Sequence, residues 1–227
     1  DRLLSSGVQG LALRGIASPE VSRRLRAVRE GKLPTVVYNE DIEPDLRDCF
    51  VGQDSYRSGL CAAALMQQLM PPAGCVLSVG VDPLHISSEE RIRGFFAHFR
   101  SQHSAVDVSP VVYGGGNRDT VYRLTREKLD VLPQLTGIFV SGAGLAGAAR
   151  AVDDANLSGR VKIVGFDITD SNTAFLREGT VQFLIDQGPY AQGYCSIQLL
   201  TDAIFQDKPI ALSYYDTGIQ IKNLYNC

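Results

Sequence analysis

Short runs rich in β-branched residues alternate with longer amphipathic segments along the whole chain. The run at 35–39 (TVVYN) follows a segment that begins with Ser-Pro-Glu at 18–20 and stops at Gly31. Those three residues supply an N-cap, a proline at the first helical position and an acidic first turn, so they predict a helix. Strands that alternate with helices form parallel sheets covered on both faces, because each parallel connection needs a crossover. The pattern therefore predicts an α/β fold.

The other segments repeat this alternation. Further strands are predicted at 8–13, 49–52, 75–80, 108–115, 137–140, 161–167 and 181–186, with two short ones near 211–215 and 218–223. Helices are predicted from Asp54 to about Met70, from a capping box formed by Ser87 and Glu90, from Asn117, from about Leu145, around Ala174 and from Pro189. This number of strands is too large for one small sheet. We therefore expect two lobes, residues 1–78 with 187–216 and residues 79–186 with 217–227.

Composition excludes several classes of protein. With 22 Lys and Arg against 25 Asp and Glu, the chain lacks the basic surplus that nucleic-acid binding by this segment would need. No apolar run is long enough for a membrane span, so no membrane partner is expected. Five cysteines without a C-x-x-C pair indicate free thiols rather than a disulfide framework or metal site, and hence a reducing, cytoplasmic location. No cofactor is expected.

A glycine motif offers a rival interpretation. Gly142-Ala143-Gly144-Leu145-Ala146-Gly147 is a G-x-G-x-x-G that follows a predicted strand and opens a helix, and Asp167 comes 20 residues after its last glycine. This is the dinucleotide fingerprint in its usual context. However, several βα units precede it, whereas a dinucleotide fold normally opens with it. Small residues after a strand also serve packing alone, and we favour that interpretation.

Polar residues at the predicted strand ends are the other candidates, because open α/β sheets bind ligands there. A carboxylate, amides and guanidinium groups suit a polyhydroxylated ligand, since each hydroxyl both donates and accepts hydrogen bonds. Asp54 could equally cap the next helix. The three histidines have no Ser or Cys nucleophile beside them, so the sequence indicates no enzyme. The candidates are Arg14, Asn39, Asp54, Arg91, Asp167 and Gln187.

Several stretches, in order along the chain, resemble one family. The stretches are SSGVQGLAL, LPTVVYNED, VGQDSYRSGLCAAALM, ERIRGF, VKIVGFDITD and REGTVQFLIDQGPYAQGYCSIQLL. Together they resemble the periplasmic-binding-protein-like sugar-binding domain of LacI/GalR-type transcriptional regulators, which is shared with ribose-type periplasmic sugar-binding proteins. The resemblance implies a two-lobed fold, each lobe a parallel sheet flanked by helices, joined by crossing hinge strands. It also implies a further β-α-β segment at the front of the first lobe, before Asp1.

The resemblance gives the candidate residues roles. Asp167 and Gln187 would bind ligand hydroxyls across the cleft with Arg91, while Asn39 and Asp54 would act from the other lobe. Arg14 would face the same pocket. Gly142-Ala143 stands where the family usually has Asn-Asp, so Gly142 marks a variant loop of the site, and Arg14 with Arg91 could favour an acidic or phosphorylated sugar.

Three hypotheses follow. The first is the effector domain of a LacI-type regulator, a homodimer whose closure on a small sugar alters operator DNA binding by a helix-turn-helix headpiece outside this chain. The second is a periplasmic sugar-binding protein of a transporter. The third and most remote is an NAD-dependent oxidoreductase built on the glycine motif.

Overall fold

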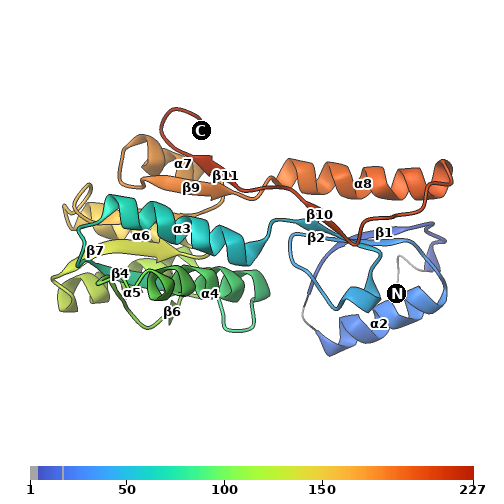
Figure 1. The fold of residues 1–227 in the computed structure, drawn as a ribbon, viewed down its shortest axis with the longest axis horizontal. Coiled ribbons are helices and arrows are strands. Elements are labelled where there is room, and N and C mark those ends of the chain that lie inside the picture. Colours follow the sequence, from blue (N-terminus) through green and yellow to red (C-terminus); the bar gives the residue numbers. More distant parts are fainter. Residues whose placement is uncertain (1–4, 17) are drawn as a thin grey trace. The chain divides into compact units, whose positions relative to one another are not determined.

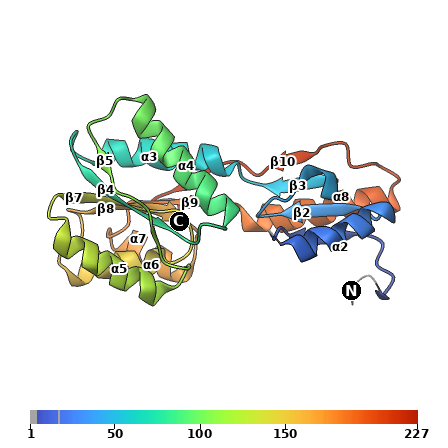
Figure 2. The same ribbon diagram turned by 90° about the horizontal axis from the view of Figure 1, so that it is seen from below.

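The computed structural model describes residues 5–16 and 18–227, and the chain divides into two compact units. The first comprises Asp1–Gln53 and Gln187–Gly218, and the second comprises Asp54–Asp186 and Ile219–Cys227. Each unit is a largely parallel sheet with helices on both faces (Figures 1 and 2). The predicted α/β class with two sheets is therefore confirmed.

The first sheet has the order β1-β2-β3-β10, and all its strands are parallel. Helices α2 and α8 cover its opposite faces (Figure 1). Val37 packs with Leu25 of α2, whereas Val36 packs with Leu200 of α8, because successive residues of a strand point to opposite faces. The elements of this unit are β1 (Leu11–Arg14), α2 (Pro19–Glu30), β2 (Thr35–Tyr38), a 3-10 turn (Pro44–Leu46), β3 (Cys49–Gly52), α8 (Pro189–Phe205) and β10 (Tyr214–Asp216).

The second sheet has the order β11-β9-β8-β7-β4-β5, with β6 also paired to β4 and only β11 antiparallel. Helices α3 and α4 lie on one face and α5, α6 and α7 on the other (Figure 2). The elements are α3 (Ser55–Leu69), β4 (Cys75–Gly80), α4 (Ile86–Ser101), β5 (Asp107–Val108), β6 (Val112–Tyr113), α5 (Arg118–Val131), β7 (Leu135–Val140), α6 (Leu145–Asp154), β8 (Lys162–Phe166), α7 (Asp170–Arg177), β9 (Phe183–Asp186) and β11 (Gln220–Lys222).

The expected first lobe, residues 1–78 with 187–216, extended too far along the chain. Strand β4 pairs with β7 in the second sheet, and α3 packs closely against α4. Residues 54–78 therefore belong to the second unit, and the boundary is corrected to Gln53. Asp54, which was expected to act from the first lobe, is the first residue of the second unit.

Helix starts follow the predicted caps except at α4. Asp54 accepts a hydrogen bond from the Arg57 amide and caps α3. The capping box at Ser87 is wrong, because the N-cap lies two residues earlier, at His85, which accepts a hydrogen bond from the Ser88 amide. The hydroxyl of Ser88 instead accepts a hydrogen bond from the Val81 amide. None of the helices in the described part of the chain combines the length and apolarity that a membrane span requires.

Candidate functional site

Four strands of the second sheet end at one level. Gly80 pairs with Tyr113, and the registers of the neighbouring strands bring Ser141 and Phe166 to the level of Gly80. Residues in register on parallel strands face the same side. That side carries α3 and α4, since Phe166 belongs to the core cluster of Phe95. The row formed by Tyr113, Gly80, Ser141 and Phe166 is here called the strand-end row.

Arg91 from α4 lies across this row. It is only 3% exposed, its guanidinium carbon lies 4.0 Å from the centroid of the Phe166 ring, and its Nη1 donates to the Ser141 carbonyl at 2.9 Å. A desolvated cation–π contact of this kind stabilises by about 2 kcal/mol. The guanidinium is therefore held in one orientation, as a group that recognises a ligand should be.

The backbone of Arg91 is fixed as well. A Cβ atom at Gly59 of α3 would lie 2.0 Å from the Arg91 carbonyl oxygen, and one at Gly94 of α4 would lie 2.1 Å from the Tyr56 carbonyl oxygen. The two glycines thus let α3 and α4 approach until their backbones touch. This crossing holds Arg91 at the carboxyl ends of the strands.

Asp167 follows β8 in a left-handed backbone conformation, with φ of 75°. Hydrogen bonds fix its backbone, because its amide donates to the Ile185 carbonyl and its carbonyl accepts from Asn172 Nδ2. Asp and Asn adopt this conformation more readily than other residues that carry a side chain. Asp167 lies next to Phe166, so the structure brings it to the same strand ends as Arg91.

The first unit gathers three predicted residues at its own strand ends. Asn39 follows β2, also with a positive φ of 66°, and its Nδ2 lies 3.5 Å from Gln187 Oε1. Arg14 ends β1 and forms an ion pair with Glu40. The backbone of Gln187 is fixed, because its backbone carbonyl accepts hydrogen bonds from Gln192 Nε2 and Thr217 Oγ1.

The last two predicted residues have different surroundings. Asp54 caps α3, as the capping interpretation proposed, and is half-buried. Gly142 is buried directly after Ser141 and has only backbone groups to offer a ligand. Neither residue adds a side chain to the strand-end row.

The glycine fingerprint has a packing explanation. A Cβ atom at Gly147 would lie 2.1 Å from the Arg118 carbonyl oxygen, so this glycine lets α6 approach α5. Gly144 has φ of 101°, and a Cβ atom there would lie 2.6 Å from a methyl group of Val121 on α5. At Gly142 it would lie 2.7 Å from a methyl group of Val81. The three glycines serve contacts within the second unit, and these account for the motif without a nucleotide.

Sequence reasoning missed two groups at these strand ends. Glu40 is buried and forms an ion pair with Arg14, and it directly follows the predicted Asn39. Tyr113 lies over Gly80, where a Cβ atom would meet its ring carbons at 2.7 Å. Burial and a hydrogen bond with Glu89 raise the pKa of the Tyr113 phenol, so it keeps its proton as a donor. The signal for Tyr113 was its place at the end of a predicted strand.

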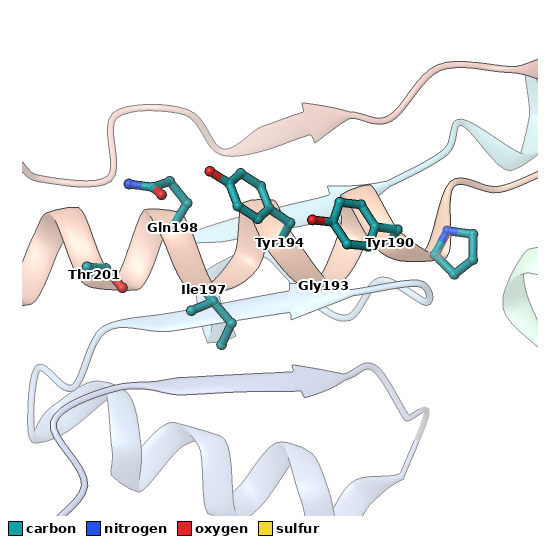
Figure 3. A pocket seen from close by; sticks show the side chains of 7 residues that line it. Tyr190, Gly193, Tyr194, Ile197, Gln198 and Thr201 are labelled. Carbon is teal, nitrogen blue, oxygen red and sulfur yellow. The ribbon is translucent and has the colours of Figure 1, made fainter.

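A groove on α8 contains none of the predicted residues (Figure 3). The rings of Tyr190 and Tyr194 stack along it with centroids 6.1 Å apart, and Gly193 and Ile197 lie beside them. No charged side chain lines this groove. Its aromatic, uncharged character is that of a packing surface.

The described residues contain no group of three or more His, Cys, Asp or Glu side chains that could hold a metal ion. The polar groups at the strand ends are instead a guanidinium, carboxylates, amides and a phenol. Two α/β units that end in such hydrogen-bonding groups have the architecture of a two-lobed ligand-binding protein. The chain belongs to the periplasmic binding protein domain family, whose model matches residues 1–208.

Solved structures agree with this assignment. A sugar-binding protein of a sugar ABC transporter from Bacillus halodurans is 25% identical, with a TM-score of 0.90 over 99% of this chain and 81% of its own. AraP, an arabinose-binding protein from Geobacillus stearothermophilus, is also 25% identical, with a TM-score of 0.86 over 99% of this chain and 80% of its own. GanP, a glucose-galactose binding protein from the same organism, shares the fold at 20% identity, with a TM-score of 0.87 over 98% of this chain and 79% of its own. No curated protein sequence matches the chain.

Proposed function

We propose that this protein binds a sugar and acts as the solute-binding component of a sugar transporter. The observation that carries the sugar-binding part is Arg91, which is fixed on the Phe166 ring and the Ser141 carbonyl at the strand ends where Asp167 follows β8. A guanidinium and a carboxylate at the same strand ends suit hydroxyl groups, the first as donor and the second as acceptor. In the first unit, the side-chain amides of Asn39 and Gln187 can also form hydrogen bonds with hydroxyl groups.

The relatives support transport over regulation. The Bacillus halodurans protein is described as the sugar-binding protein of an ABC transporter, and AraP as an arabinose-binding protein. A transport role is the second of the hypotheses that the sequence left open. Operator DNA binding, a homodimer and the cytoplasmic location stay predictions of the regulator hypothesis.

Sugar binding is tested by thermal shift and calorimetry with pentoses, hexoses, polyols, sugar acids, sugar phosphates and NAD. A sugar at 100 times its Kd should add about 2.7 kcal/mol to the free energy of unfolding. We expect Arg91→Ala or Asp167→Ala to weaken binding roughly 10- to 100-fold, since a hydrogen bond to a charged group contributes about 1.5–3 kcal/mol. Arg123→Ala, on the exposed face of α5, is the matched control. A response to NAD and to none of the sugars would refute the proposal.

The transport role needs a separate test. Cells that lack the gene should lose uptake of the labelled sugar, and fractionation should place the protein outside the cytoplasm. Normal uptake, together with retention of the tagged protein on operator DNA, would instead support the regulator. Sugar binding itself would stand in either case.

A further inference from the structure

Arg14, at the strand ends of the first unit, forms an ion pair with a buried carboxylate. Arg14 keeps a side chain that is 52% exposed, yet its Nη2 contacts Glu40 Oε1 at 2.5 Å. The Glu40 side chain is only 8% exposed. The positive charge that Arg14 would offer an anion is therefore already balanced.

The backbone holds Glu40 in this place. Its amide donates to the Tyr38 carbonyl at 2.8 Å, and the Gly15 amide lies 3.4 Å from the same carbonyl. A Cβ atom at Gly15 would lie 2.0 Å from the Glu40 carbonyl oxygen, so the chain after β1 touches the chain after β2. Glu40 is thus a built part of the same strand ends as Asn39 and Arg14.

We propose that Glu40 is a specificity-determining residue that makes this protein select uncharged sugars over sugar acids and sugar phosphates. The proposal rests on the proposed sugar-binding function and names the charge of its ligand. Glu40 acts by neutralising Arg14, so that this pair offers an anion no net positive charge. Two arginines in the sequence suggested an acidic ligand, whereas the Arg14–Glu40 pair favours a neutral one.

The expected size of the effect follows from Coulomb's law. An anion about 6 Å from an unbalanced guanidinium, at an effective dielectric constant of about 20, would gain roughly 100-fold in affinity from that charge. Solvent around the exposed Arg14 screens part of this attraction, so we expect a gain of at least about tenfold. Glu40 cancels this attraction in the wild type, and removing its negative charge should restore it.

The test compares the wild-type protein with Glu40→Gln by calorimetry. The ligands are the neutral sugar found in the screen, its uronic acid and its 6-phosphate. We expect the wild type to prefer the neutral sugar, and Glu40→Gln to bind the two anions at least about tenfold more tightly than the wild type does. Glu30→Gln, which removes an equal charge at the exposed end of α2, is the matched control and should bind as the wild type does.

A double variant links the effect to Arg14. Arg14→Met added to Glu40→Gln removes the uncovered cation, so the gained affinity for anions should disappear. Glu40→Ala replaces Glu40→Gln if the latter does not fold. An unchanged preference in Glu40→Gln, or a wild type that prefers the uronic acid, overturns the proposal while sugar binding stands. A wild type that binds no sugar at all overturns the proposed function as well.

Discussion

The crossing of α3 and α4 should fail when Gly59 is replaced by alanine. The added Cβ atom would lie 2.0 Å from the Arg91 carbonyl oxygen, 1.4 Å short of the 3.4 Å at which ordinary contact begins. The obstacle is backbone and cannot rotate away, so the cost should reach about 3 kcal/mol, the upper part of the usual range for overpacking. Alanine regains about 1 kcal/mol through its higher helix propensity. The expected net loss is about 2 kcal/mol in the free energy of unfolding.

The matched control is Gly193→Ala in α8. No atom lies within 4 Å of a Cβ atom built there, so only the propensity acts and the variant should gain about 1 kcal/mol. Urea unfolding followed by circular dichroism measures both variants. If the two units unfold in separate transitions, each substitution should shift only the transition of the unit that contains it. Gly59→Ala should also weaken sugar binding, because the atom it displaces belongs to Arg91. Equal stability gains in the two variants would refute the reasoning.

Two further predictions concern titratable groups. Burial lowers the pKa of His98, whose Nε2 lies 2.7 Å from Gln67 Oε1, so the unfolded chain binds its proton at a higher pH than the folded chain does. The wild type should therefore lose more stability than His98→Gln as pH falls below about 6.5, the model-peptide pKa, and parallel unfolding curves from pH 7.5 to 5 for the two proteins would contradict this. Burial also raises the pKa of the Cys49 and Cys75 thiols, so both should react slowly with a thiol reagent at neutral pH and rapidly in urea, as mass spectrometry of the labelled peptides can show.

The fold was largely predictable because its signals are local. The Ser-Pro-Glu start of α2 and the caps Asp54 and Asn117 lie within a few residues of the helices they begin. The boundary between the units was not predictable in this way. The pairing of β4 with β7, far along the chain, and the packing of α3 against α4 show that α3 belongs to the second unit.

The candidate site was predictable in part. The position after a parallel strand correctly brought Asp167 to the end of β8 and Asn39 to the end of β2. The same rule could not show that Arg91 lies on the Phe166 ring, because residues 91 and 166 meet only through the strand order β8-β7-β4. Nor could it reveal Glu40, whose importance comes from its burial beside Arg14 and not from its place in a motif.

The backbone at Asn39 and Asp167 shows how local and tertiary effects combine. Each residue follows a strand with a positive φ, a conformation that costs up to about 1–3 kcal/mol for residues other than glycine. Glycine would remove this cost, but it would also remove the amide or carboxylate. In each case the backbone amide donates a hydrogen bond to a neighbouring strand, that of Asn39 to the Val51 carbonyl and that of Asp167 to the Ile185 carbonyl. Because those bonds impose the conformation, the two positions favour residue types that tolerate a left-handed backbone and can also bind hydroxyl groups.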